Sequence, residues 1–264
     1  MTTPILEATG LRKEFTGGKV AADDVSLTLP PGGSTGIVGE SGSGKTTVAR
    51  MLVGLETPTA GTVSVDGEPL TTGGAIRHGW AERLRRARRI QLAFQDPYAS
   101  LDPRQTISTG IDELLRLHEP DRDRRRDRAA ELLDQVGLDA RMARSTPSAL
   151  SGGQRQRVAI ARALVSRPKV LVPDDAVSAL DVSIQAQVLN LLTDLRDELG
   201  ISYLFVTHDL AVVQHVTDEL IVIHQGRVVE HGTTDQVLTA PQHSYTRDLL
   251  AAVPREGRRP TRHL

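Results

Sequence analysis

Two glycine-rich runs of this sequence carry residues suited to binding phosphate. Residues 39–46 read Gly-Glu-Ser-Gly-Ser-Gly-Lys-Thr and match the P-loop pattern G-x-x-x-x-G-K-[ST]. In that motif, backbone N–H groups converge on phosphate oxygens at the positive end of the following helix. The lysine reaches the β- and γ-phosphates, and the final hydroxyl ligates Mg²⁺. The run therefore predicts a nucleoside triphosphate site made by Gly39, Glu40, Ser41, Gly42, Ser43, Gly44, Lys45, Thr46 and Thr47.

The second run, residues 150–154, reads Leu-Ser-Gly-Gly-Gln and opens a predicted helix. A serine-led turn of this kind can grip a phosphate, yet it lies far along the chain from the P-loop. The two runs can serve one nucleotide if two chains meet head to tail. In that arrangement each chain completes the other's site with Ser151, Gly152, Gly153 and Gln154.

Three further polar residues follow predicted strands. A P-loop needs a carboxylate at the end of a neighbouring strand to hold Mg²⁺ through water, and Asp174 follows the apolar run 170–172. Gln95 closes the run 90–94, where an amide can reach both the metal and the attacking water. His208 ends the run 203–207, where an imidazole can hold the γ-phosphate and stabilise charge in the transition state. Each residue type also has a purely structural use, the aspartate as a turn or cap residue.

The elements that must position these groups alternate along the chain. Residues 35–38 predict a strand that enters the P-loop, and residues 46–55 a helix that leaves it. Short strands are expected within 5–30 and 61–70, and further ones at 170–172, 203–206 and 220–223, separated by helical stretches such as 183–199. This alternation favours a parallel sheet covered on both faces.

The stretch from 97 to 165 differs, because it has little β signal, many charges and helical periodicity. We interpret it as a helical subdomain inserted into a nucleotide-binding core formed by 1–96 and 166–234. Residues 235–264 then form a short, proline-punctuated C-terminal segment.

Composition and net charge exclude several kinds of partner and site. The chain has 264 residues, 39% of them hydrophobic, and a formal charge of −1, so net charge gives no general attraction to nucleic acid or anionic lipid. The arginine-rich stretches 83–89 and 122–128 lack interleaved aromatics, and the second alternates with aspartates; both patterns favour solvated helix faces over nucleic-acid binding.

There are no cysteines, which excludes disulfides and thiolate metal sites. No apolar run approaches the roughly 20 residues that span a bilayer, and the N-terminus lacks a secretory signal. We expect a cytosolic protein that reaches a membrane only through a partner.

Taken together, the motifs closely resemble those of the ABC ATPase family over residues 5–250. The matching parts are the P-loop at 39–46, the Q-loop glutamine Gln95, the signature at 150–154, the Walker B aspartate Asp174, the D-loop at 178–181 and the switch histidine His208. The resemblance implies an α/β fold, with a P-loop (RecA-like) sheet core, an N-terminal antiparallel β subdomain and an inserted α-helical subdomain. It also implies ATP and Mg²⁺ as ligands, and makes Phe15 the aromatic that stacks on adenine, although a core phenylalanine would look the same.

A narrower resemblance concerns residues 94–104 and 241–254, which look like segments of the ATPases of peptide and nickel importers. In that branch a second, usually different ATPase subunit pairs with the first beneath two transmembrane permease subunits, fed by an extracytoplasmic solute-binding protein. The resemblance implies a place on the cytoplasmic face of the membrane and uptake of a peptide, a nickel chelate or another small solute. No nucleic-acid partner is expected. Some members hold an iron–sulfur cluster on C-terminal cysteines, which this chain lacks.

The sequence departs from the family pattern at one catalytic position. Asp175 stands where the family has a glutamate that polarises the attacking water. Aspartate is shorter by one methylene, about 1.5 Å, and a misplacement near 1 Å costs roughly 10²-fold in rate. We hypothesise that this chain's own site is slow, while its intact residues 151–154 complete a faster partner site. Asp175 working adequately after a small shift of backbone or water is the simpler alternative.

Two other functions stay open from the sequence. The first is an ATP-binding regulatory half of a heterodimer with little turnover, which the Asp175 substitution keeps open. The second is a non-transport ABC ATPase that acts on nucleic acid or ribosomes. Such proteins usually carry two cassettes, a long coiled-coil insertion or zinc-binding cysteines, and this sequence has none of these.

Overall fold

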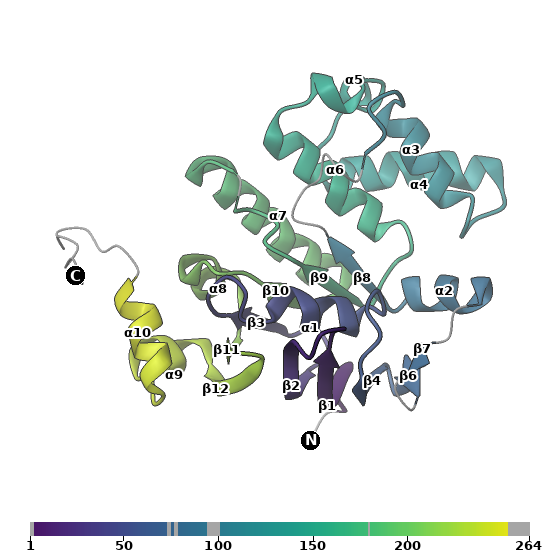
Figure 1. The fold of residues 1–264 in the computed structure, drawn as a ribbon. Helices are drawn as coiled ribbons and strands as arrows, with labels where there is room; N and C mark the ends of the chain where they lie inside the picture. Colours follow the sequence, from purple (N-terminus) through teal and green to yellow (C-terminus); the bar gives the residue numbers. More distant parts are fainter. Residues whose placement is uncertain (1–2, 73–74, 77–78, 94–100, 179, 253–264) are drawn as a thin grey trace.

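The computed structural model describes residues 3–72, 75–76, 79–93, 101–178 and 180–252 (Figure 1). An antiparallel sheet lies near the N-terminus. Its strands, in spatial order, are β2 (Val20–Leu29), β1 (Leu6–Glu14), β4 (Ala60–Val65) and β5 (Glu68–Pro69). A short ribbon follows, made of β6 (Thr71–Thr72) and β7 (Ala75–Ile76). The predicted antiparallel β subdomain is therefore present.

A six-stranded sheet forms the centre of the molecule. Its spatial order is β12 (Arg227–Thr233), β11 (Glu219–His224), β3 (Ser34–Val38), β10 (Ser202–Val206), β9 (Val170–Pro173) and β8 (Ile90–Ala93). Strands β11 through β8 pair in parallel. The parallel pairing expected of the runs 170–172, 203–206 and 220–223 is confirmed, whereas β12, a strand that the sequence did not predict, pairs with β11 antiparallel. Gln225 and Gly226 both have positive φ, 48° and 79°, and such a two-residue turn returns the chain as a hairpin.

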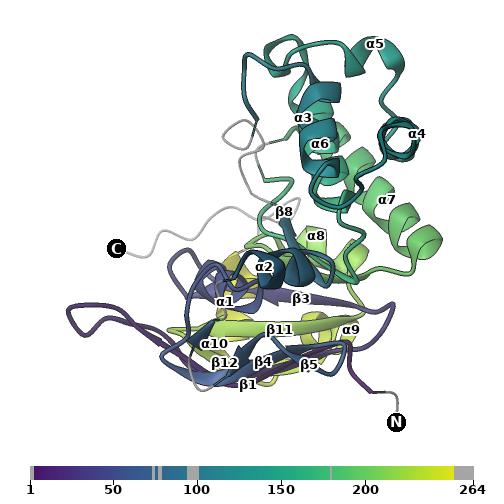
Figure 2. The same ribbon diagram turned by 90° about the vertical axis from the view of Figure 1, so that its right-hand side faces the viewer.

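Some helices cover the faces of this sheet, and others form a separate lobe. They are α1 (Lys45–Leu52), α2 (Trp80–Ala87), α3 (Ile107–Leu115), α4 (Arg122–Gln135), α5 (Ala140–Ala143), the short 3₁₀ helix η1 (Pro147–Ala149), α6 (Gly152–Leu164), α7 (Val182–Leu199), α8 (Leu210–Val216), α9 (Thr234–Thr239) and α10 (Ser244–Ala252). Helices α3 to α6 gather on the side of the molecule opposite β1 (Figure 2). They lie within the predicted insert, whose boundaries at 97 and 165 stay a prediction.

Hydrophobic clusters lie on both faces of the central sheet because side chains alternate along its strands. Val170 and Leu204 pack toward α1 and the antiparallel sheet. Leu171 and Phe205 face the opposite way, into a core with α6, α7 and α8. The sheet is therefore covered on both faces, as its continuous apolar strands predict.

The helix after the P-loop is shorter than predicted, ending at Leu52 rather than at residue 55. Gly54 has φ 71°, and the N–H of Leu55 donates to the carbonyl of Arg50 at 2.8 Å, which closes the helix. The predicted helix 183–199 agrees with α7, whose first turn is capped by the Asp181 carboxylate on the N–H of Ile184. Within the described residues, no helix combines the length and the apolar character that crossing a membrane requires.

Candidate nucleotide-binding site

The P-loop runs from the end of β3 to the start of α1, along a path that only glycine can follow at two points. Gly39 and Gly44 have φ of 155° and 108°. A Cβ on Gly39 would collide with the carbonyl oxygen of Ile223, and one on Gly44 with that of Ala21. The loop is also tied to the β11–β12 turn, because the N–H of Gly226 donates to the Ser43 carbonyl at 2.8 Å. Neighbouring strands therefore fix the loop before any ligand arrives.

Lys45 is folded back over this loop. Its Nζ donates to the carbonyl oxygens of Gly39, at 2.8 Å, and Glu40, at 2.7 Å. Burial lowers the pKa of Lys45, and the nearby carboxylates of Asp175, Asp174 and Glu40 act in the opposite direction. The ammonium is thus held in the middle of the loop, where phosphate oxygens can replace the two carbonyls.

Asp174 and Thr46 come together at the end of β9. The Thr46 Oγ1 lies 3.4 Å from the Asp174 Oδ1, and the Asp174 N–H donates to the Ala93 carbonyl of the next strand at 3.0 Å. Asp174 is buried, and burial, followed by the charge of Asp175, raises the pKa of its carboxyl. A hydroxyl and a carboxylate are the hard oxygen ligands that Mg²⁺ prefers. Because a cation would relieve the unfavourable burial of this carboxylate, the pair fits the ion.

Asp175 and His208 form a second pair beside the first. The Nδ1 of His208 lies 3.1 Å from the Oδ1 of Asp175, so two residues on neighbouring strand ends are hydrogen-bonded. The Asp175 backbone adopts a left-handed conformation, with φ 46°. Two hydrogen bonds hold this backbone. The Asp175 N–H donates to the Val206 carbonyl at 2.7 Å, and the Asp175 carbonyl accepts from the Ser178 hydroxyl at 3.0 Å.

A cavity of about 760 Å³ opens over the P-loop. Its lining consists of Phe15, Lys19, Ala21, Gly39, Glu40, Ser41, Gly42, Gly44, Lys45, Thr46, Thr47, Asp175, His208 and Leu249. Phe15 is 38% exposed, and the Lys13 Nζ lies 5.0 Å from its ring centroid. The cavity thus brings together the predicted aromatic, the P-loop and the Asp175–His208 pair. Sequence reasoning gave Lys19, Ala21 and Leu249 no place at the nucleotide, because none of the nucleotide-binding motifs includes them.

The glycine-rich run 150–154 lies elsewhere in the chain. Ser151 caps α6 by accepting from the Gln154 N–H at 3.2 Å, and the Gln154 Oε1 accepts from the Ser151 N–H at 2.9 Å. A Cβ on Gly153 would collide with Ile184, so α6 packs closely on α7. Among the described residues, none of 151–154 lines the P-loop cavity. That this run completes the nucleotide site of a second chain stays a prediction.

Gln95, predicted to act at the metal and the attacking water, lies outside the described residues. So does Ala179 of the D-loop. Their places at the site stay predictions.

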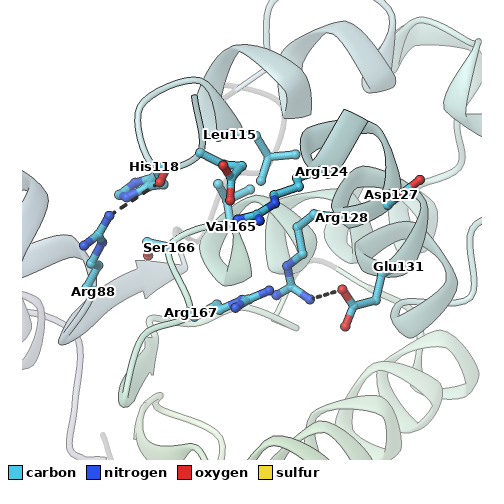
Figure 3. A pocket seen from close by; sticks show the side chains of 11 residues that line it. Arg88, Leu115, His118, Arg124, Asp127, Arg128, Glu131, Val165, Ser166 and Arg167 are labelled. Atoms are coloured by element: carbon cyan, nitrogen blue, oxygen red, sulfur yellow. Dashed lines mark hydrogen bonds and ion pairs between the residues drawn. The ribbon is translucent and has the colours of Figure 1, made fainter. Parts of the chain in front are cut away.

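A second cavity, of about 820 Å³, lies between the end of α3, helix α4 and the turn after α6 (Figure 3). Arg88, Arg124, Arg128 and Arg167 line it, and they include members of both arginine-rich stretches. Glu119, Asp127 and Glu131 line it too, and a nitrogen of Arg128 lies 2.8 Å from a Glu131 oxygen. The carboxylates offset much of the positive charge, and no P-loop residue reaches this cavity.

Comparisons with known proteins place the chain in a family. The sequence model described as ABC transporter matches residues 22–178. The dipeptide transport ATP-binding protein DppF of Haemophilus influenzae is 44% identical over 263 residues, which cover 96% of this chain and 79% of DppF. The glutathione import ATP-binding protein GsiA of Pectobacterium atrosepticum is 47% identical over 248 residues, covering 93% of this chain and 39% of GsiA.

Solved structures agree with these matches. The cbiO1 protein of Clostridium perfringens, part of the ABC transporter complex cbiONQ, is 27% identical with a TM-score of 0.81, covering 90% of this chain and 91% of cbiO1. The ATP-binding cassette MJ0796, in a dimeric post-hydrolysis state bound to ADP and Pi, is 30% identical with a TM-score of 0.75, covering 87% of this chain and 98% of MJ0796. The chain therefore belongs to the ABC transporter family, as an ATP-binding ATPase subunit of the branch that contains the peptide importers.

Proposed function

We propose that this subunit drives the uptake of a peptide or a similarly small solute, paired with a second and different ATPase subunit. The pair would sit on the cytoplasmic face of the membrane beneath two permease subunits, and an extracytoplasmic binding protein would deliver the solute. Relatives whose names specify dipeptide and glutathione support this cargo class. ATP would close the two ATPase subunits and hydrolysis would reopen them, which moves the permeases between their two states.

Within the site, we assign a role to each residue from its position. The P-loop amides and Lys45 would bind the β- and γ-phosphates, and Phe15 the adenine face. Thr46 and Asp174 would hold Mg²⁺, with Gln95 as a further ligand. The ion, when bound, supplies charge neutralisation on the phosphate oxygens. Asp175 would orient the attacking water, and His208 would hold the γ-phosphate end of the nucleotide.

The length of the Asp175 side chain and its contact with His208 support the proposal that this chain's own site hydrolyses ATP slowly. The Asp175 side chain is one methylene shorter than a glutamate, and one of its oxygens lies 3.1 Å from the His208 ring nitrogen. The Asp175 carboxylate must therefore serve both the His208 imidazole and the attacking water. That water lies further from it than it would from the longer side chain of a glutamate. We infer that ATP bound by this chain turns over slowly, while Ser151 and its neighbours complete a faster site on the partner.

This inference favours a heterodimer over a homodimer. In a homodimer both sites would contain Asp175 and both would be slow, whereas a different partner can supply a glutamate at the equivalent position. The same reasoning keeps the regulatory role as the second candidate, in which this chain binds ATP with little turnover. We also propose the division into a core (1–96 and 166–234), a helical insert (97–165) and a C-terminal segment (235–264) as the units of this subunit.

The test uses the assembled complex of both ATPase subunits and both permeases. Lys45→Ala in this chain is compared with the equivalent lysine variant in the partner. We expect the variant in this chain to retain a substantial part of ATP hydrolysis, and the variant in the partner to leave only the slow hydrolysis of this chain's own site. The proposal fails if the two variants have reversed effects, or if this chain forms an active complex alone with the permeases. Uptake assays with labelled dipeptides and with glutathione then identify the solute class.

A further inference from the structure

The C-terminal helix α10 touches the phosphate-binding loop directly. The hydroxyl oxygen of Tyr245 accepts a hydrogen bond from the backbone N–H of Glu40, at 2.9 Å. Glu40 is the second residue of the P-loop, so a side chain from the last helix holds the backbone near the loop's entry. None of the motifs that define the nucleotide site includes Tyr245.

The phenol of Tyr245 is fixed from several sides. Its ring lies over the His224 imidazole, with centroids 3.9 Å apart and planes tilted by 33°. The turn before α10 is anchored to β12, because the Glu230 carboxylate accepts from the N–H groups of Gln242, at 2.7 Å, and His243, at 3.1 Å. A side chain held this firmly can define the position of the peptide group it binds.

The same helix face reaches the nucleotide cavity. Leu249 follows Tyr245 by four residues, so the two lie on one face of α10. Leu249 lines the cavity over the P-loop, as Phe15 does. Tyr245 and Leu249 also pack against a buried hydrophobic cluster whose members include Val38 of β3 and Val222 of β11. Two separate contacts, one polar and one apolar, therefore connect α10 to the site.

We propose that Tyr245 is a positioning residue for nucleotide binding, which orients the P-loop through the Glu40 amide before ATP enters. A loop already held in its binding conformation loses less conformational entropy when the ligand arrives. Because the effect depends on the docking of α10, the C-terminal segment sets part of the nucleotide affinity. This inference rests on the proposed role of the P-loop, and Lys45→Ala tests that role separately.

The test compares Tyr245→Phe with the unmodified full-length chain. The substitution removes the hydroxyl and keeps the ring on His224. Tyr203→Phe is the matched control, since the Tyr203 hydroxyl is buried in β10 without a hydrogen-bond partner among the described residues. Three measurements are made on each protein: the Kd for MgATP by calorimetry, hydrogen–deuterium exchange at the Glu40 amide, and thermal unfolding without nucleotide.

For Tyr245→Phe we expect the Kd to rise about two- to tenfold, as the loss of one hydrogen bond implies, and the Glu40 amide to exchange faster. Tyr203→Phe should change neither quantity. Leu249→Ala, which leaves the Tyr245 hydroxyl in place, should also raise the Kd. Unchanged Kd and Glu40 exchange in Tyr245→Phe would overturn the proposal, as would an equal rise in Kd for Tyr203→Phe. MgATP binding by Lys45→Ala at unmodified affinity would overturn the P-loop role itself.

Discussion

Asp175 and His208 are joined at the rim of the nucleotide cavity, with the carboxylate Oδ1 3.1 Å from the imidazole Nδ1. The aspartate side chain is 16% exposed and the histidine 57%, so the inner partner of the pair is the acid. The two residues come from the turns after β9 and β10, and their bond links the group that would orient water to the group that would hold phosphate.

Lengthening the acid tests whether its reach limits turnover. Asp175→Glu in the assembled complex should raise the ATP hydrolysis rate of this chain's own site by about tenfold, because the added methylene restores roughly 1.5 Å of reach. The measurement is steady-state turnover with the partner's site disabled by its P-loop lysine variant. Asp175→Asn, equal in length to aspartate and uncharged, is the control and should lower the rate. No gain from the glutamate would show that side-chain length is not limiting.

Asp174 predicts a pH dependence of stability with a definite sign. Burial raises the pKa of this carboxyl above its ordinary value of 3.8. The folded chain therefore keeps the proton at pH values where the unfolded chain has released it. This group's ionisation destabilises the fold above the raised pKa, and the penalty disappears as the pH falls through that pKa toward 3.8.

Asp174→Asn should thus stabilise the nucleotide-free chain at pH 7, raising the Tm by roughly 2–4 °C, with the difference from the unmodified chain shrinking at lower pH. The same variant should also lose the additional rise in Tm that Mg²⁺ gives the chain when ATP is bound. Thermal unfolding at several pH values, with and without MgATP, checks both. Asp194→Asn, an exposed position on α7, is the control. A destabilised Asp174→Asn chain at pH 7 would contradict the argument.

Phe15→Ala tests the base-stacking role. The ring is already 38% exposed, so its removal should change the free energy of unfolding little. Loss of stacking should raise the Kd for ATP about tenfold. Fluorescence titration with ATP and with inorganic triphosphate, which has no base, separates the two effects. Leu199→Ala, at 37% exposure, controls for loss of an exposed apolar group. If triphosphate binding weakens as much as ATP binding does, Phe15 does not contact the base.

Ser151→Ala tests whether the signature run serves the partner. It removes the cap of α6, and a lost cap costs about 1 kcal/mol. Asp121→Ala removes the cap of α4 and provides the matched control for stability. Only Ser151→Ala should lower ATP hydrolysis at the partner's site, while MgATP binding to this chain's P-loop stays unchanged. Equal effects of both variants on hydrolysis would assign Ser151 a structural role alone.

Much of the site could be predicted from the sequence because its parts follow fixed local rules. The P-loop needs glycines at set spacing, and Asp174 and His208 follow apolar runs that form adjacent strands. Carboxyl ends of parallel strands meet at one edge, so these side chains converge although they are distant in sequence.

Other features depend on long-range packing that no local pattern encodes. The reversal of β12 depends on positive φ at Gln225, a residue that gives little turn signal. The place of Leu249 at the cavity depends on how α10 packs against a buried cluster drawn from β3, β11, α8 and α9. The bond between Asp175 and His208 depends on the backbone conformation at residue 175, and the place of Gln95 stays a prediction.

The left-handed backbone at Asp175 has a consequence for anyone who redesigns this enzyme. Aspartate and asparagine enter that region more readily than other residues with a Cβ. A single exchange to a longer acid supplies reach while it disfavours the turn that aims the side chain, so Asp175→Glu should recover about tenfold of the roughly 10²-fold that reach alone would give. Accelerating this ATPase further is accordingly a problem of loop geometry, and libraries that vary residues 176 and 177 together with 175 are the appropriate starting point.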